Sequence, residues 1–307
     1  MNDKHVIIGA NGPIGGAISN ILENSGKQVI RTGRAFKQEN NYLIIDALNE
    51  KEVLNATKKA SHIYVTIGLN YNHKVWQRDW PIIIENVINA ARTNHSKIIF
   101  FDNIYIYGPE LMVPITETHS KEPISKKGKV RKIIFDALNK AMSDVKIMIV
   151  RAPDFFGPNA KSSIIHSAFL ENMIVGKRPM FFGNDSKKHS YAYTIDLATA
   201  VVLLALEEDT YNQEWHLPTY QTNNIYEIVK EYNKCLNSDL KLSFISKRMQ
   251  KILSIFVPIL KEVYEMRYQF ESDYVLNFDK FSKRFPNFKQ TKFEDAVNIT
   301  VTSFLNN

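Results

Sequence analysis

The fold is decided by the stretch Val6-Ile7-Ile8-Gly9-Ala10-Asn11-Gly12-Pro13-Ile14-Gly15-Gly16, which runs on into Ala17-Ile18-Ser19-Asn20-Ile21-Leu22. An apolar run, a glycine-rich turn and a helical pattern follow one another, as in a strand, a phosphate loop and a helix. The first two glycines allow a tight turn and a close approach to a pyrophosphate, and the third lets helix and strand pack closely. The free N–H groups of the helix start face the phosphates. The stretch therefore predicts a dinucleotide site; the alternative is an ordinary turn without a ligand. The predicted contact residues are Gly9, Asn11, Gly12, Pro13, Ile14 and Gly15.

The rest of the first half alternates short apolar runs with helical periods. Such alternation is typical of βαβ units and a buried parallel sheet. It predicts an α/β fold, a doubly wound parallel-sheet Rossmann fold with a smaller C-terminal α/β substrate lobe. The Rossmann domain is expected over residues 1–150 with a returning segment at about 186–210, and the smaller lobe over 151–185 and 211–307. Expected strands are 28–34 (with its loop), 42–46, 62–67, 97–101 and 146–151, and expected helices are 51–59, 81–92 and 129–142.

Composition narrows the class of protein. The chain has 307 residues, of which 44% are hydrophobic, enough for a sizeable core. No run approaches the ~20 apolar residues of a membrane span, and the first strand begins too early for a signal peptide. Cys235 is the single cysteine, which fits a reducing compartment, so a cytoplasmic location is expected. The net charge of +7 is scattered apart from 126–132, so no nucleic-acid partner is predicted, and no metal site is predicted either.

One apolar stripe, over 249–268, allows two interpretations. Its apolar residues recur at helical spacing and can rest on a membrane surface. Such a stripe is more often a core-facing or interface helix, and Pro258 interrupts any single long amphipathic helix. The sequence therefore favours a core-facing or interface role.

The end of the second expected strand bears on cofactor choice. An acid at this place accepts hydrogen bonds from the ribose 2′-OH of NAD, whereas an arginine accommodates the 2′-phosphate of NADP. The chain has Arg31-Thr32-Gly33-Arg34 there, with no acid before Glu39. A guanidinium grips a phosphate with two hydrogen bonds. Arg31 and Arg34 therefore predict NADP(H) over NAD(H), unless they belong only to a solvated loop.

Several further motifs resemble the extended short-chain dehydrogenase/reductase superfamily, in its NAD-dependent epimerase/dehydratase branch. The resemblance rests on the glycine turn, Ile106-Tyr107-Gly108-Pro109, the stretch from Arg151 to Pro158, and Asp196-Leu197-Ala198. It implies that Asp46 contacts the adenine and that Ile67 and Gly68 line the adenosine side; alternatively, Asp46 caps the following turn. Extended members often dimerise through helices that correspond to 81–92 and 129–142, so a homodimer is expected.

The catalytic pattern departs from this family. The family carries Ser or Thr four residues before the tyrosine of the Tyr-Gly pair, where this chain has Asn103. Further on it carries Tyr-x-x-x-Lys, where this chain has Lys127 and Arg131. The resemblance implies that Arg131 still holds the cofactor ribose. Lys127 can act as a general acid if burial beside other cations makes its proton easier to release; the alternative is a surface lysine at a helix start.

Other proton donors and two substrate positions complete the candidate site. Tyr107 and Tyr193 rank first among the tyrosines as alternative donors. Where the family's nucleotide-sugar enzymes place an asparagine, this chain has Asp154, and where they place a diphosphate-clamping arginine it has His189. Both changes weaken diphosphate binding, so a small-molecule substrate that is not a nucleotide sugar is expected.

Two functions follow from this pattern. The first is an NADP(H)-dependent oxidoreductase or epimerase, in which Lys127 or a tyrosine moves the proton. The second is an NADP(H)-binding sensor that keeps the fold and has lost the chemistry, since a fold alone does not carry function. Hydride exchange with a substrate distinguishes the two.

Overall fold

The computed structural model describes residues 3–35, 41–109, 113–183, 186–220 and 224–306. The chain divides into two compact units. The first unit comprises Met1–Asp102, Lys127–Arg151 and Leu197–Leu217, and the second comprises Asn103–Lys126, Ala152–Asp196 and Pro218–Asn307.

The first unit contains a parallel sheet with the strand order β10-β6-β5-β4-β1-β2-β3. The interior strand β1 pairs with β2 on one side and with β4 on the other, so the order of strands reverses there. Ligands of open α/β sheets bind at the carboxyl ends of the strands at such a switch point. The strands are β1 (Lys4–Ile8), β2 (Gln28–Gly33), β3 (Tyr42–Ile44), β4 (His62–Val65), β5 (Lys97–Asp102), β6 (Ile147–Arg151) and β10 (Gln213–His216).

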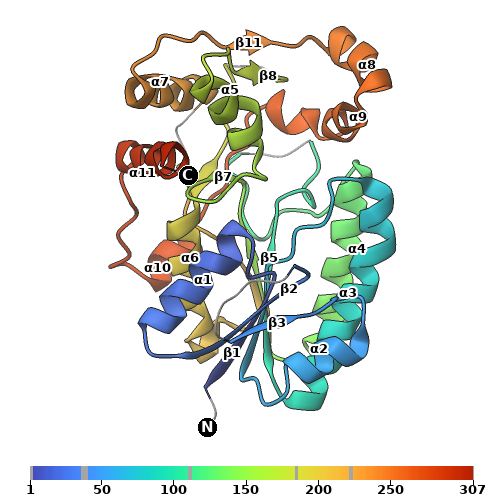
Figure 1. Ribbon diagram of the computed structural model, residues 1–307. Coiled ribbons are helices and arrows are strands. Elements are labelled where there is room, and N and C mark those ends of the chain that lie inside the picture. The colour runs from blue at the N-terminus through green and yellow to red at the C-terminus, as the bar shows by residue number, and fades with distance from the viewer. Residues whose placement is uncertain (1–2, 36–40, 110–112, 184–185, 221–223, 307) are drawn as a thin grey trace. The chain divides into compact units, whose positions relative to one another are not determined.

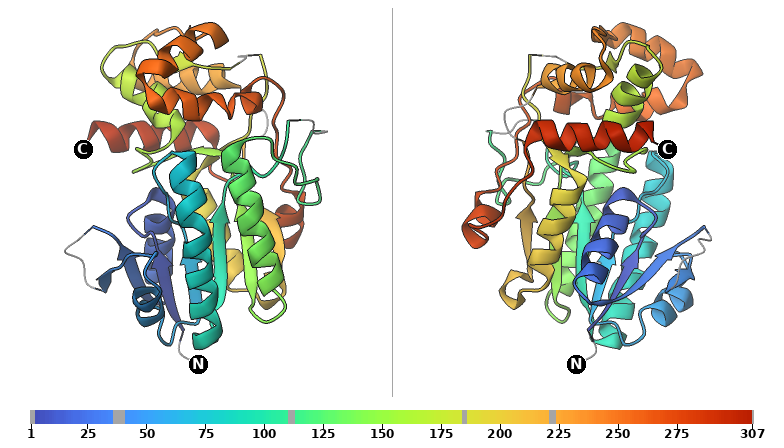
Figure 2. Two further views of the ribbon diagram at one scale, coloured as in Figure 1. Left: turned by 90° about the vertical axis from the view of Figure 1, so that its right-hand side faces the viewer. Right: turned by 60° about the vertical axis from the view of Figure 1, so that its left-hand side comes forward.

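Helices cover both faces of this sheet, which confirms the predicted doubly wound fold (Figures 1 and 2). α3 and α4 lie on one face, and α1 and α6 lie on the other. The strands β4 and β6 are buried along their whole length, including the polar residues His62 at the start of β4 and Arg151 at the end of β6. The helices and the short 3₁₀ turn are α1 (Pro13–Asn24), α2 (Glu50–Ala56), α3 (His73–Asn94), α4 (Lys126–Ala141), α6 (Thr194–Ala205) and η2 (Glu208–Thr210).

The helix α3 begins well before the expected start at residue 81. The side chain of Asn72 caps it by accepting bonds from Lys74 N and Val75 N, and Pro81 lies inside the helix. The additional turns bury Trp76 and Trp80 in the first unit. Their burial offsets the backbone bond that an internal proline removes.

The second unit is built around an apolar core that includes Phe156, Tyr193, Ile228 and Val297. Two short parallel pairs, β7 with β9 and β8 with β11, accompany the helices. Its strands are β7 (Asp154–Phe156), β8 (Met180–Phe181), β9 (Tyr191–Tyr193) and β11 (Ser243–Phe244). Its helices are η1 (His166–Leu170), α5 (Glu171–Ile174), α7 (Ile225–Leu236), α8 (Lys247–Phe256), α9 (Pro258–Tyr264), η3 (Arg267–Phe270), α10 (Asp279–Arg284) and α11 (Phe293–Leu305).

The apolar stripe of 249–268 forms α8, α9 and η3, with the break at the expected place before Pro258. A core-facing role is wrong for its most apolar part, because Ile255 and Phe256 are 76% and 78% exposed. Within the described parts of the chain, we find no helix with the length and apolar content that crossing a membrane requires.

Candidate functional site

The glycine loop joins β1 to α1 at the carboxyl edge of the sheet. Gly9 has a φ of +102°, and a Cβ there would lie 2.9 Å from the backbone of Thr66 and Ile67. A Cβ on Gly15 would lie 2.5 Å from the carbonyl oxygen of Gly9, so only glycine lets α1 approach the loop this closely. The amides of Gly9 and Ala10 donate to the carbonyl of Thr32, which ties the loop to the end of β2.

Gly12 is less crowded than the other two glycines of the loop. A Cβ there would meet its nearest neighbour, the carbonyl oxygen of Gly9, at 3.4 Å, which leaves it far less crowded than at Gly9 or Gly15. Gly12 is the N-cap of α1 and supplies no side-chain cap, whereas Asn49 and Asn72 cap the next two helices. The helix start thus presents backbone N–H groups and room for a close approach. This cradle fits the pyrophosphate of a dinucleotide.

The two candidate arginines at the end of β2 have different surroundings. Arg31 donates to both carboxylate oxygens of Glu23, at 3.0 and 2.7 Å, and to Asn20. Arg34 is exposed just after Gly33, and the side chain of Asn11 from the glycine loop reaches Tyr42 beside it at 2.7 Å. The contact to a 2′-phosphate stays a prediction for both arginines, and Arg34 is the stronger candidate because Arg31 already holds Glu23.

The adenosine-side residues have mixed surroundings. Asp46 accepts from the amide of Leu48 at 3.0 Å, which is the turn cap that the alternative interpretation describes. The exposed carboxyl of Asp46 leaves an adenine contact as a prediction. Ile67 and Gly68 follow β4 directly, and the backbone of Ile67 lies against Gly9.

The two positions of the altered catalytic motif lie in the first turns of α4. Lys127 is fully buried, and its ammonium lies 4.5 Å from the centre of the Tyr71 ring. A cation over an aromatic face recovers part of the hydration it loses on burial. The alternative of a surface lysine is therefore wrong for Lys127.

Arg131 is held on two sides. Its guanidinium carbon lies 4.5 Å from the Trp76 ring centre and 4.3 Å from that of Trp80, and its Nε lies 3.2 Å from Asp102 Oδ1. Asp102 also forms an ion pair with Arg151, which in turn binds Glu214 at 2.8 Å. Arg131 is thus part of a buried charge network. Its bond to a cofactor ribose stays a prediction.

The sequence reasoning missed Asp102 as a functional residue. Asp102 ends β5 immediately before Asn103 and is buried between two arginines on different elements. An acid at the end of an otherwise apolar strand is the available signal, because a buried carboxylate needs a cationic partner.

The tyrosines proposed as donors lie in the second unit. The carbonyl of Tyr107 accepts from the hydroxyls of Tyr268 and Tyr274, at 3.1 and 3.2 Å, and the ring of Tyr107 is fully buried. Asn103, which replaces the family's Ser or Thr, accepts from the amide of Tyr105 at 3.0 Å. These bonds hold the loop after β5 in place.

Tyr193 lies on β9, in the core of the second unit. Its ring centre is 5.9 Å from that of Phe156. Burial, reinforced by the carboxylate of Asp196, raises the pKa of Tyr193 to about 12. The phenol is therefore protonated at neutral pH and packs as an aromatic core residue.

Asp154 and His189, the two departures at the substrate positions, are bonded to each other. His189 Nε2 lies 3.0 Å from Asp154 Oδ2. The ring of His189 is buried and stacks on Phe270 with centroids 4.6 Å apart. The carboxylate of Asp154 is therefore engaged by His189 within the second unit.

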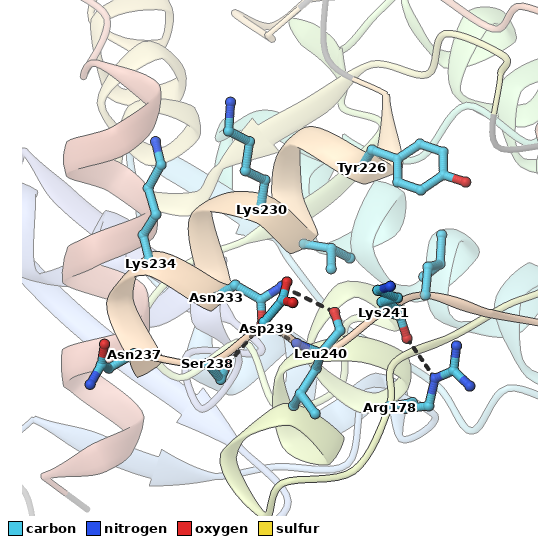
Figure 3. A pocket seen from close by; sticks show the side chains of 12 residues that line it. Arg178, Tyr226, Lys230, Asn233, Lys234, Asn237, Ser238, Asp239, Leu240 and Lys241 are labelled. Carbon is cyan, nitrogen blue, oxygen red and sulfur yellow. Dashed lines mark hydrogen bonds between the residues drawn. The ribbon is translucent and has the colours of Figure 1, made fainter.

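A groove of about 660 Å³ lies between α7 and the segment after it in the second unit (Figure 3). Asn233 bonds Ser238 and both backbone polar groups of Leu240, so these polar groups stabilise the turn. In Figure 3, Lys230 and Lys234 extend from α7 away from that turn. Lys230 and Lys234 therefore do not converge on the turn.

Among the described residues, one group of side chains has the composition of a metal site: Asp3, His5 and His62. The rings of His5 and His62 stack with centroids 4.5 Å apart and planes within 3°. The lone pair of an imidazole nitrogen lies in the ring plane, so two parallel rings cannot direct their lone pairs at one ion. Tyr64 binds His5 at 3.0 Å, and Ser61 binds His62 at 2.8 Å. The geometry fits a stacked neutral pair better than a metal centre.

This histidine pair predicts acid sensitivity of the fold. Burial, followed by the charges of His5 and Lys97, lowers the pKa of His62 to about 3, while Asp3 and Glu208 oppose the shift. Because the unfolded histidine binds a proton at higher pH, the stability is complete above about pH 6.5 and falls between pH 6.5 and 3. We expect a loss of roughly 2 kcal/mol at pH 5, measured by urea unfolding. His62→Gln should remove this part of the slope, and an identical slope in that variant would contradict the assignment.

Comparisons with known proteins agree with the fold and the glycine loop. The model of the NAD dependent epimerase/dehydratase family matches residues 5–217. A protein named uncharacterized protein y4nL, from Sinorhizobium fredii, is 28% identical over 131 residues, which is 42% of this chain and 36% of that protein. The chain thus matches about a third of the length of that curated relative.

Solved structures extend the likeness to the whole chain. The Bordetella bronchiseptica enzyme WbmH, in complex with NAD+, is 16% identical with a TM-score of 0.79, covering 99% of this chain and 98% of that one. UDP-glucose 4-epimerase from Thermotoga maritima, with UDP-glucose, is 18% identical with a TM-score of 0.81 and 99% coverage of both chains. UDP-N-acetylglucosamine 4-epimerase from Methanobrevibacter ruminantium is 17% identical with a TM-score of 0.81, covering 100% of this chain and 99% of that one.

These neighbours contradict the expectation that the substrate is not a nucleotide sugar, because they are named as UDP-sugar epimerases. The expectation assumed a bare charge at Asp154, and the structure pairs that carboxylate with His189. The family match spans more than half of the chain and includes the glycine loop, β5 and α4. The chain therefore belongs to the NAD-dependent epimerase/dehydratase family and is an NAD(P)-dependent enzyme of that kind.

Proposed function

We propose that this enzyme uses NADP(H) to epimerise or oxidise a nucleoside-diphosphate sugar, and that Lys127 moves the proton in place of the family's tyrosine. The observation that carries the proposal is the complete burial of Lys127 in the first turn of α4. The amine of Lys127 stands at the position of the family's proton-transferring tyrosine. As a neutral amine it would accept the proton of a sugar hydroxyl while the hydride leaves, and as an ammonium it would return that proton to the keto oxygen.

The cofactor is proposed to lie on the first unit. The N–H groups at the start of α1 hold its pyrophosphate, Arg34 holds a 2′-phosphate, and Ile67 and Gly68 line the adenosine side. The nicotinamide, when bound, supplies the hydride acceptor or donor. Arg131 does not move a proton in this proposal. Its guanidinium contacts Asp102 of β5 and two tryptophans of α3, and so fixes the position of α4 against these two elements.

Asp154 and His189 are proposed as a substrate-binding pair. The contact between His189 Nε2 and Asp154 Oδ2, at 3.0 Å, fixes both side chains, so that they can bind the polar groups of the substrate together. The likeness to UDP-sugar epimerases supports this substrate class.

The decisive experiment incubates the full chain with NADP+ and a panel of UDP- and dTDP-sugars, and follows reduced nicotinamide by absorbance and sugar isomers by NMR. We expect a sugar isomer or oxidised product from at least one member of the panel. Bound NADP(H) without hydride exchange on any nucleotide sugar would overturn the proposal and favour the sensor.

Cofactor choice gives a separate prediction for Arg34. Arg34→Ala should weaken the binding of NADPH by about 10- to 100-fold, because a charge-assisted pair of hydrogen bonds to phosphate is lost. The affinity for NADH, which lacks the 2′-phosphate, should change by less than about threefold. Isothermal titration with both cofactors measures the effect. Arg31→Ala is the matched control, since Arg31 already binds Glu23. An equal loss for both cofactors would argue against a 2′-phosphate contact.

A further inference from the structure

Helices α8 and α9 bury polar side chains and expose apolar ones. The buried residue of α8 is Gln250 and that of α9 is Glu262. Gln250 accepts from Arg267 Nη1 at 2.8 Å and donates to the carbonyl of Leu260, which joins the two helices through a polar interior. This arrangement reverses the usual burial of an amphipathic helix. The apolar side of the pair is left to face outward.

The outward side is large and continuous in sequence. On α8 the exposed residues Met249, Ile252, Ile255 and Phe256 recur at a spacing that places them on one helical face. Val257 and Ile259 extend this surface across the break into α9. We name these six residues the α8–α9 patch. The two helices form one corner of the second unit (Figures 1 and 2). Such a contiguous apolar surface marks an interaction site.

Positive charge surrounds this patch. Residues 247–262 contain Lys247, Arg248, Lys251 and Lys261, all exposed, whereas their single acid, Glu262, is buried. Lys247 binds Glu271 at 2.9 Å. Arg248, Lys251 and Lys261 therefore share the outer surface with the apolar side chains.

We propose that the α8–α9 patch docks the enzyme on the surface of an anionic lipid bilayer. Apolar side chains on one helical face enter the boundary between headgroups and acyl chains, while lysine and arginine side chains bind lipid phosphates. A second copy of the chain fits less well, because a two-fold symmetric contact through this patch brings Arg248 and Lys251 of one copy near the same cations of the other. Charge complementarity thus selects the bilayer.

The test measures binding of the full chain to vesicles by co-sedimentation. One set of vesicles is phosphatidylcholine and the other is phosphatidylcholine with phosphatidylglycerol. We expect binding to the anionic set, weakened by tenfold or more in Ile255→Ser/Phe256→Ser. Arg248→Glu/Lys251→Glu should lose the preference for the anionic set, by about tenfold. The matched control is Ile299→Ser, an exposed residue of α11, which should bind as the unmodified chain does.

The result can overturn the proposal in two ways. The proposal is wrong if the unmodified chain binds neither set of vesicles. It is also wrong if Ile255→Ser/Phe256→Ser binds as well as the Ile299→Ser control. Light scattering on the same samples identifies the competing occupant: a dimer that becomes monomeric in Ile255→Ser/Phe256→Ser, without vesicle binding, assigns the patch to a second copy. Circular dichroism checks that each variant is folded.

Discussion

Asp102→Asn is expected to lower the free energy of unfolding by about 3–5 kcal/mol. The carboxylate of Asp102 is 1% exposed and forms ion pairs with Arg131 and Arg151, which are themselves buried. Neutralising it leaves two guanidinium groups close together without their shared counter-charge, in a place where water cannot replace it. Urea unfolding of the full chain, followed by circular dichroism, measures the loss.

A matched control distinguishes the effect of losing a buried ion pair on stability from the effect of losing an exposed one. Asp144 binds Arg92 at 2.6 Å, with both side chains about half exposed. Asp144→Asn should cost less than about 1 kcal/mol, because solvent screens an exposed pair. A similar small loss in both variants would show that the Asp102 network contributes little to stability.

Lys127→Ala is expected to lower kcat by about 10²- to 10⁴-fold, the contribution typical of a positioned acid or base. The proposed site of NADPH is formed by the glycine loop and Arg34, so its dissociation constant should change by less than about threefold. Steady-state kinetics with the nucleotide sugar found active, and titration with NADPH, measure the two effects.

Lys129→Ala is the control, because Lys129 lies on the same helix and is exposed. Its kcat should stay within about twofold of the unmodified enzyme. Lys127→Arg keeps the charge and loses the ability to release a proton, so it should be as inactive as Lys127→Ala. Full activity of Lys127→Arg would assign Lys127 a purely electrostatic role.

The predicted fold follows from local physics. Gly9 and Gly15 have no room for a side chain, and the strands read as short apolar runs because a parallel sheet is buried on both faces. Neither signal needs knowledge of distant residues. Helix ends were less predictable. The helix α3 starts at His73 because Asn72 caps it and because Trp76 is buried, and the burial of Trp76 depends on the sheet against which α3 packs.

The sequence predicts which positions belong to the candidate site, but not which side chains contact one another there. The spacing from the Tyr107-Gly108 pair, under the family resemblance, predicts Lys127 and Arg131 at the positions of the family's catalytic pair. The partners of Arg131 come from α3 and β5, and only packing brings these elements together. Asp154 and His189 were each interpreted as an unfavourable change for a diphosphate, whereas in the structure the two side chains contact each other.

The chain's sequence by itself determined the Rossmann-like sheet, the dinucleotide loop and the loss of the usual tyrosine and serine, since these depend on residue types at fixed local spacing. Only the tertiary structure decided which charges are paired and which helix face is covered. Periodicity predicts helices α8 and α9 but says nothing of the side on which the rest of the chain packs. Gln250 is buried and accepts a hydrogen bond from Arg267 of η3, whereas Phe256 is exposed, and this arrangement depends on how η3 packs against α8.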